Sequence, residues 1–118
     1  MDFDNNKPIY LQISDSLCER ILRGEFAEEE RIPSVREYGS SIGVNPNTVM
    51  RTYETLTQDG IIYNKRGIGY FVCPGAKDLI LEIQRTAFLD EELPAIIKRM
   101  RLLQIPLSVL TEKMKEEQ

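Results

Sequence analysis

The chain begins with an amphipathic pattern that has the spacing of an α-helix. Apolar side chains recur at intervals of three or four residues, which places them on one face of a helix: Tyr10, Ile13, Leu17 and Ile21. Pro8 suits the first turn of such a helix, and Gly24 suits its C-terminal end. We therefore predict a first helix over residues 8–23 with this face buried.

Two further helices, joined by a very short turn, are predicted next. Ser34 and Glu37 fit a capping box, in which each side chain bonds the backbone amide of the other residue, and Gly43 ends this helix. Asn45 and Pro46 begin the following helix as its cap and its first residue. Helical spacing predicts the buried positions: Val35, Tyr38 and Ile42 in one helix, then Val49, Tyr53 and Leu56 in the other.

A β-hairpin is predicted behind these helices. Residues 61–63 and 69–72 are rich in β-branched and aromatic side chains, which is typical of short strands. Residues 64–68 form the predicted turn, with two adjacent cations at its tip, and residues 31–32 are expected to form another short strand. Two helices with a tight turn and a following hairpin predict a winged helix-turn-helix.

The rest of the chain is predicted to be helical. A Pro-Gly pair at residues 74–75 breaks the chain. Pro94 either kinks one long helix or starts a second one, and a last helix begins near Pro106. Apolar side chains keep helical spacing along this tail: Leu79, Ile80, Ile83, Ala87, Phe88, Ile96, Ile97, Met100 and Leu103. The predicted fold class is α+β, mainly α, with a winged helix-turn-helix over residues 1–74 and a short helical region over residues 75–118.

The charge of the chain is unevenly distributed. A formal net charge of −4, taken alone, argues against binding to nucleic acid. Residues 31–73, however, carry five basic and three acidic side chains, a local charge of +2, while acidic side chains gather at residues 28–30 and 90–92. A basic face on an acidic protein is compatible with DNA binding.

Several features favour a cytoplasmic protein. No run of about 18 apolar residues is present that could span a membrane. The acidic residues 1–4 lack the apolar core of a signal peptide. Cys18 and Cys73 have no CxxC spacing, which indicates reduced thiols. Because Cys18 lies beside an apolar stripe, we expect it to serve packing and not reactivity.

The sequence argues against an enzyme. It contains no histidine, which excludes a histidine base, a histidine-containing triad and a histidine metal site. Gly67, Ile68 and Gly69 lack the strand-to-helix setting that a phosphate-binding loop requires. We expect no catalytic residue, no metal and no cofactor, and nothing in the sequence identifies a small-molecule effector.

The start of the third predicted helix is the part of a recognition helix that enters the major groove of DNA. Its polar side chains suit base edges and phosphates: Asn45, Asn47, Thr48 and Arg51. Asn45 has an alternative role as a helix cap. Arg36 is a further candidate. Lys65 and Arg66 in the predicted turn either contact phosphate or the minor groove, or are ordinary solvated turn residues.

Five segments in this order resemble the DNA-binding domain of the GntR family over about residues 8–72: PIYLQI at 8–13, RIPSVRE at 31–37, GVNPNTV at 43–49, DGII at 59–62 and RGIGYFV at 66–72. The resemblance implies DNA contacts from Ser34, from Arg36, from the recognition-helix start at Asn45, Asn47 and Thr48, and from Arg66 and Gly67 in the wing. Many relatives carry arginine where this chain has Met50. Arg51 is the next residue, which helical geometry rotates by about 100°.

The tail, with Glu92-Leu93-Pro94 and Met100-Arg101-Leu102-Leu103, resembles the YtrA subfamily, which has a minimal dimerisation region. It carries more apolar surface than one face packed on a small domain can bury, and too little chain for its own core. A two-fold partner with the same surface is the simplest solution. The expected interface is Leu79, Ile83, Phe88, Ile97, Met100 and Leu103.

We therefore expect a homodimeric transcription regulator that binds a palindromic operator in double-stranded DNA. The subfamily resemblance implies a repressor of an operon such as a transporter operon. The alternative is a winged-helix module that binds proteins and leaves its DNA face unused.

Overall fold

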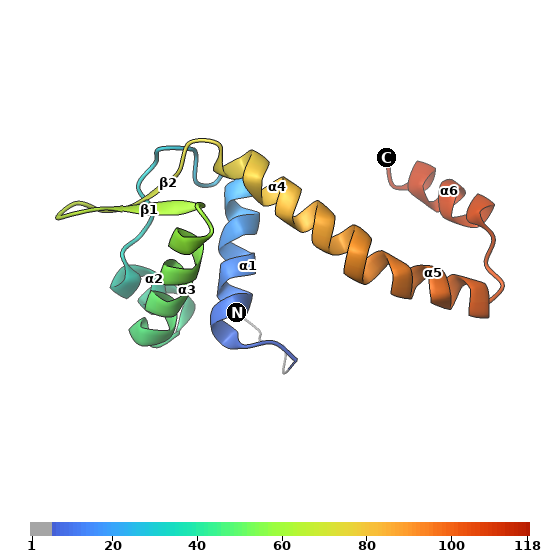
Figure 1. Ribbon diagram of the computed structural model, residues 1–118, viewed down its shortest axis with the longest axis horizontal. Coiled ribbons are helices and arrows are strands. Elements are labelled where there is room, and N and C mark those ends of the chain that lie inside the picture. Colours follow the sequence, from blue (N-terminus) through green and yellow to red (C-terminus); the bar gives the residue numbers. More distant parts are fainter. Residues whose placement is uncertain (1–5) are drawn as a thin grey trace. The chain divides into compact units, whose positions relative to one another are not determined.

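The computed structural model describes residues 6–118, so the acidic residues 1–4 lie outside it. The chain forms two compact units, which divide between Leu81 and Glu82. The first unit contains α1 (Ile9–Leu22), α2 (Val35–Ile42), α3 (Pro46–Gln58), β1 (Ile62–Lys65), β2 (Gly69–Val72) and the start of α4 (Ala76–Ala87) (Figure 1). The second contains the rest of α4, then the π-helical turn η1 (Phe88–Glu92), α5 (Leu93–Leu102) and α6 (Leu107–Glu116). No helix within residues 6–118 is long and apolar enough to cross a membrane.

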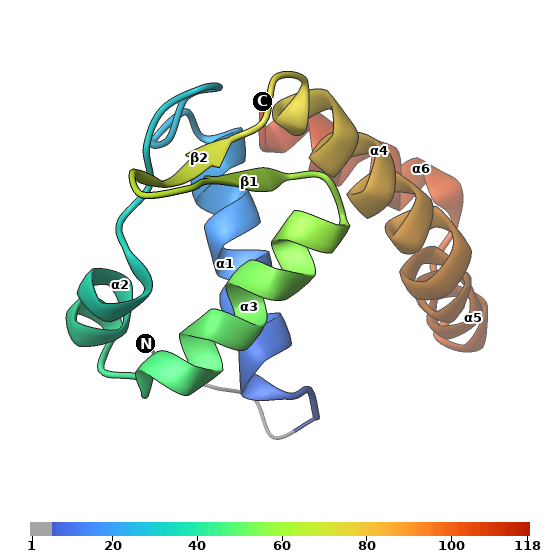
Figure 2. The same ribbon diagram turned by 60° about the vertical axis from the view of Figure 1, so that its left-hand side comes forward.

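The core of the first unit forms where α3 packs against both α1 and α2 (Figure 2). The predicted faces of α1 and α3 are confirmed, because their central apolar residues are almost completely buried: Ile13, Leu17, Ile21, Val49, Tyr53 and Leu56. Tyr10 is only half-buried. The buried hydroxyl of Thr52 donates a hydrogen bond to the backbone carbonyl of Tyr10 at 2.7 Å, which ties α3 to the start of α1.

The predicted helix ends are confirmed. Ser34 caps α2 in a capping box with Glu37, and Gly43 ends α2 in the left-handed conformation with φ 71°. Asn45 caps α3 through its side-chain oxygen, and Pro46 occupies the first turn. These local hydrogen bonds set the lengths of both helices and leave a very short connection between them.

The wing is an antiparallel hairpin in which Ile62 pairs with Val72 and Lys65 with Gly69. The turn is shorter than the predicted residues 64–68, because Asn64 and Lys65 belong to β1. The expected strand at residues 31–32 is reduced to an isolated bridge between Arg31 and Phe71.

The first unit extends beyond the Pro-Gly break into α4. Ala76 and Ile80 are buried in its core, with Ile80 only 1% exposed, and Leu79 packs against that core. Ile80 is therefore unavailable to a partner chain, and Leu79 is only partly available. The apolar surface that was expected to contact a partner chain therefore begins beyond Ile80 on α4.

The second unit accommodates Pro94 within a helical segment by means of a π-helical turn. Pro94 has no amide hydrogen for the carbonyl four residues earlier, and its ring would collide with that carbonyl in a regular α-helix. In η1 the amide of Leu93 bonds instead to the carbonyl of Phe88, five residues earlier, while the flanking Ala87 and Leu93 keep right-handed helical angles. Pro94 thus lies in the first turn of α5, and the backbone stays helical from α4 to α5.

The two cysteines differ in their surroundings. Cys18 is buried in the core, and desolvation, with smaller effects of Asp15 and Asp59, raises the pKa of its thiol from 9.0 to about 12. Cys73 is half-buried, and its pKa is also raised by desolvation and by Glu29. Packing as the role of Cys18 agrees with this burial.

We expect Cys18 in the folded protein to resist alkylation by iodoacetamide at about pH 8, because the thiolate is the reactive form. Cys73 should react slowly, and both thiols should react quickly in denaturant. Peptide mass mapping over time measures both rates. Modification of Cys18 as fast as Cys73 without denaturant would show that the α1 core opens more readily than its burial implies.

Candidate nucleic-acid interface

The buried side of α3 determines which of its residues face solvent. Because Val49, Thr52, Tyr53 and Leu56 are buried, the opposite side carries the exposed residues Asn47, Met50, Arg51 and Glu54. The predicted contact residues Asn47 and Arg51 lie one turn apart on this face, and Thr48 is half-buried at its edge.

The tight connection between α2 and α3 depends on Gly39, a residue that the sequence analysis missed. A Cβ atom at Gly39 would lie 2.7 Å from the carbonyl oxygen of Val44, and the amide of Val44 donates to the carbonyl of Gly39 at 2.9 Å. The signal in the sequence was a glycine inside a predicted helix, where it is less favourable than alanine by about 1 kcal/mol. Its small size sets the angle at which α3 leaves α2.

Two predicted contact residues already serve as helix caps. The Ser34 hydroxyl accepts from the Glu37 amide at 3.1 Å, and the Asn45 side-chain oxygen accepts from the Asn47 amide at 2.8 Å. The alternative role foreseen for Asn45 is therefore confirmed. Both side chains keep hydrogen-bond donors: the Ser34 hydroxyl hydrogen and the Asn45 amide group.

Glu37 stays charged in this capping box. Hydrogen bonds from the backbone and the side chain of Ser34, and to a smaller extent the charge of Arg31, hold the pKa of its carboxyl below the usual 4.5. At neutral pH the charged carboxylate therefore remains available to accept from the Ser34 amide.

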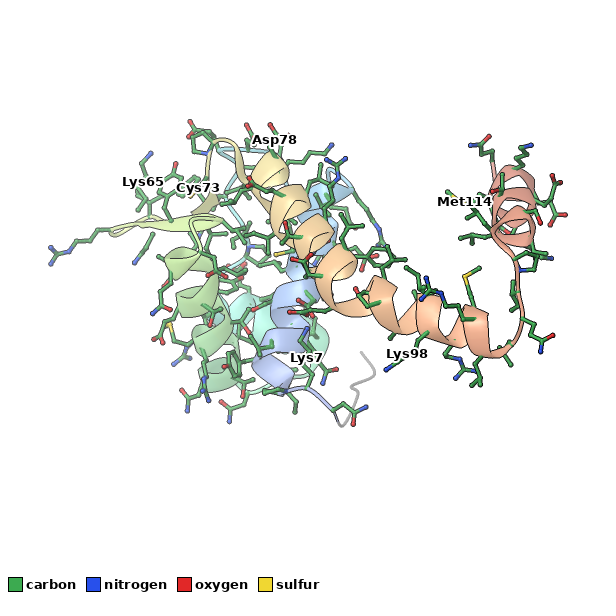
Figure 3. All side chains as sticks on the ribbon, turned by 45° about the vertical axis from the view of Figure 1, so that its right-hand side comes forward. Lys7, Lys65, Cys73, Asp78, Lys98 and Met114 are labelled. Atoms are coloured by element: carbon green, nitrogen blue, oxygen red, sulfur yellow. The ribbon has the colours of Figure 1, made fainter. Side chains whose placement is uncertain are left out.

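The cationic side chains that were predicted to contact DNA are exposed, and their charge is not balanced by a neighbouring carboxylate in the described part of the chain. Arg36 lies in the first turn of α2, Lys65 at the end of β1 and Arg66 in the turn of the wing; Figure 3 shows Lys65 projecting from the hairpin. Within residues 6–118 none of the three forms an ion pair with a carboxylate. Lys65 also lies 5.2 Å from the centre of the Phe71 ring, a cation–π distance that favours an ordered side chain.

Arg31 is a cation beside β2 of the wing that was not among the contact residues predicted from the sequence. A Cβ atom at Gly69 would lie 2.9 Å from Nε of Arg31, so the absence of a side chain at Gly69 makes room for the guanidinium. The charge of Arg31 also acts on Glu37 at the start of α2. Its closeness to the wing follows from the bridge between Arg31 and Phe71, whereas its closeness to α2 follows from its position three residues before the cap at Ser34.

An aromatic series joins the wing to the helices. The Tyr70 ring meets Tyr53 edge-on with centroids 4.9 Å apart, and the Tyr53 hydroxyl donates to the carbonyl of Pro33 at 2.6 Å. The Tyr70 hydroxyl lies 4.0 Å from the sulfur of Met50, which is 40% exposed. The apolar Met50 thus faces the wing side of α3, and Arg51 faces the α1 side.

The side chains exposed at this surface are suited to binding a ligand and not to catalysing a reaction. Exposed guanidinium, ammonium and amide groups come from α2, α3 and the wing of a single unit, as expected for contact with a polyanion. No cluster of three His, Cys, Asp or Glu side chains that could hold a metal ion occurs among the residues described.

Residues 9–72 match the model of the bacterial regulatory proteins of the gntR family. The helix-turn-helix transcriptional regulator YhcF of Bacillus subtilis is 35% identical over 113 residues, which cover 96% of this chain and 92% of the relative. The transcriptional repressor YtrA of Bacillus subtilis is 34% identical over 116 residues, covering 98% of this chain and 88% of the relative. A crystal structure of a GntR-family transcriptional regulator from Bacteroides thetaiotaomicron has a TM-score of 0.75 and 49% identity, covering 93% of this chain and 95% of that one.

Proposed function

The chain belongs to the GntR family of bacterial regulatory proteins, whose members bind DNA and regulate transcription, and we propose that it acts as a homodimeric repressor on a palindromic operator. The observation that supports this most directly is the set of cations without ion pairs around α3, in the first turn of α2 and on the wing. Repression of an operon such as a transporter operon, by a cytoplasmic protein, is the biological setting that the subfamily resemblance favours.

The proposed DNA contacts are Ser34, Arg36, Asn45, Asn47, Thr48, Arg51, Lys65, Arg66 and Gly67. Asn47 and Arg51 are suited to the major groove because they lie on the exposed face of α3. Gly67, with φ 80°, lets the chain turn tightly and brings the adjacent cations to the tip of the wing.

A dimer is favoured by the apolar surface of the second unit. Of the expected interface, Ile83, Phe88, Ile97 and Leu103 are each at least 38% exposed, and Met100 is half-buried. Such a large apolar surface on a small unit marks an interaction site. Contact with the same surface of a second copy would bury the apolar side chains of both copies, and a two-fold dimer of this kind is expected to bind half-sites about one helical turn apart.

Substitution Arg36→Ala should weaken operator binding by about 1–3 kcal/mol and leave the fold intact, because the side chain is exposed and unpaired. Titration of the duplex that the wild-type protein selects from a random library measures the loss. Lys77→Ala is the matched control, since Lys77 is an exposed cation of the first unit that lies on α4. Equal affinity of Arg36→Ala and wild type would remove Arg36 from the interface.

The wing should supply affinity that depends little on sequence. Neutralising Lys65 and Arg66 together should reduce the slope of log affinity against log salt by about 0.9 for each lost phosphate contact. Binding isotherms at a series of salt concentrations give this slope for the double variant and for wild type. The same slope in both proteins would mean that the wing does not touch the phosphate backbone.

The alternative function, a winged-helix module for protein contacts, predicts no affinity for any duplex. A gel shift against random-sequence DNA at low salt separates the two functions, because a DNA-binding winged helix retains non-specific affinity under these conditions.

A further inference from the structure

A shallow hollow lies between the first turn of α3 and the start of α1. Its volume is about 470 Å³, and it opens to solvent beside the exposed face of the recognition helix. Six residues line it: Pro8, Ile9, Tyr10, Asn47, Thr48 and Arg51. The hollow therefore combines three proposed DNA contacts of α3, Asn47, Thr48 and Arg51, with residues at the start of α1 that have no assigned role in binding.

Arg51 is held against the ring of Tyr10. The carbon at the centre of its guanidinium lies 4.1 Å from the ring centroid, within the range of a cation–π contact. A cation–π contact occupies the ring face of Tyr10 and uses no hydrogen bond of Arg51, so the guanidinium N–H groups stay available as donors. Arg51 forms no ion pair with any carboxylate in the part of the chain that the structure describes.

The core of the unit fixes Tyr10 in turn. Its backbone carbonyl accepts hydrogen bonds from the buried hydroxyl of Thr52 at 2.7 Å and from the hydroxyl of Ser14 at 3.0 Å. The ring is thus attached to a segment that the packing of α1 on α3 already orders. A side chain that is ordered before binding loses less entropy when it meets its ligand.

Resting on the proposed function, we infer that Tyr10 is a positioning residue that orients Arg51 to bind a backbone phosphate of the operator. Arg51 leans toward α1, at the flank of the recognition helix, whereas Met50 occupies the wing side of the exposed face. The flanks of a helix in the major groove face the phosphates that line it. A planar guanidinium with free in-plane donors matches two phosphate oxygens.

The test compares wild type with Tyr10→Phe, Tyr10→Leu, Arg51→Gln and the double variant Tyr10→Leu/Arg51→Gln, with Lys77→Gln as the control cation. Each protein is titrated at several salt concentrations against the duplex that wild type selects from a random library and against a scrambled duplex of the same composition. Thermal unfolding of each variant checks the fold, which the hydrogen bond from the Thr52 hydroxyl to the backbone carbonyl of Tyr10 should preserve.

We expect Arg51→Gln to bind both duplexes about tenfold more weakly and to reduce the salt slope by about 0.9, the value for one phosphate. Tyr10→Leu should weaken binding several-fold in the wild-type background and have no further effect when Arg51 is already replaced. Tyr10→Phe keeps the ring face and should bind as wild type does. Lys77→Gln should leave the salt slope unchanged.

Three results would overturn the inference. Independent, additive losses from Tyr10→Leu and Arg51→Gln, or no loss from Tyr10→Leu, would remove the positioning role. A loss confined to the selected duplex with an unchanged salt slope would assign Arg51 to a base edge and not to a phosphate.

If the Tyr10→Leu variant unfolds, the Arg51→Lys variant is tested in its place. Arg51→Lys should keep the salt slope of wild type but bind DNA more weakly, because an ammonium group lacks the planar shape of a guanidinium. Failure of wild type to bind either duplex would reject the proposed function itself.

Discussion

Removal of residues 82–118 should lower affinity for the full operator by about 100- to 10,000-fold, because the second half-site contact is no longer linked to the first. The cut after Leu81 keeps the whole first unit, including Ala76 and Ile80. The shortened chain is expected to remain folded, to sediment as a monomer and to bind a half-site weakly. Sedimentation and operator titration of both forms measure the effect.

A cut after Pro74 provides the matched control. It removes Ala76 and Ile80 from the core, and loss of a buried isoleucine side chain alone destabilises a protein by about 2–5 kcal/mol. This shorter chain should unfold readily, although the Pro-Gly break at residues 74–75 is where the sequence indicates a boundary. A full-length protein that sediments as a monomer at micromolar concentration, or a chain cut after Leu81 that binds the full operator as tightly as wild type, contradicts the dimer mechanism.

Gly39→Val should lower the free energy of unfolding by about 3 kcal/mol, because the new side chain must enter space occupied by the carbonyl oxygen of Val44. In a domain of this size, such a loss lowers the melting temperature by roughly 10–20 °C. The close approach involves backbone and not a flexible side chain, so α3 has to shift. Operator affinity of the remaining folded protein should therefore fall as well.

The neighbouring substitution Ser40→Ala is the control for Gly39→Val. Ser40 is exposed on the same helix, and alanine has the higher helix propensity, so its stability should be unchanged or slightly raised. Thermal and denaturant unfolding compare the variants, with gel shifts at a temperature where all are folded. Wild-type stability in Gly39→Val would mean that the connection between α2 and α3 can widen without loss.

Local hydrogen bonds made the helix ends of the first unit predictable. The capping box of Ser34 and Glu37 and the Asn45-Pro46 start depend on residues within one helical turn of each other, and both occur as expected. The wing was predictable from its β-branched and aromatic content. Its turn was overestimated, because Asn64 and Lys65 pair across the hairpin in a way that local composition does not reveal.

Contacts between distant segments were beyond the reach of the sequence. The return of Ile80 to the core, the position of Arg31 over Gly69 and the stack of Arg51 on Tyr10 each join residues far apart in the chain. Helical periodicity could place Ile80 on the apolar face of its helix, but it could not show whether that face packs on the first unit or on a partner chain. The residues of the candidate interface were therefore identifiable by type, while their mutual arrangement was not.

The π-helical turn at Phe88–Glu92 accommodates Pro94 and also sets the direction in which the side chains of α5 point around the helix axis. A π-turn accommodates one residue more than the α-helical winding it replaces, and each residue of an α-helix advances by about 100°. The side chains of α5 are therefore rotated by about this angle relative to an uninterrupted continuation of α4. Which apolar residues of α5 share a stripe with Ile83 is set by this extra residue. The length of the segment before Pro94 therefore controls which face of α5 lies in line with Ile83. Insertion or deletion of a single residue in this segment would bring a different face of α5 into line without any change in the sequence of α5.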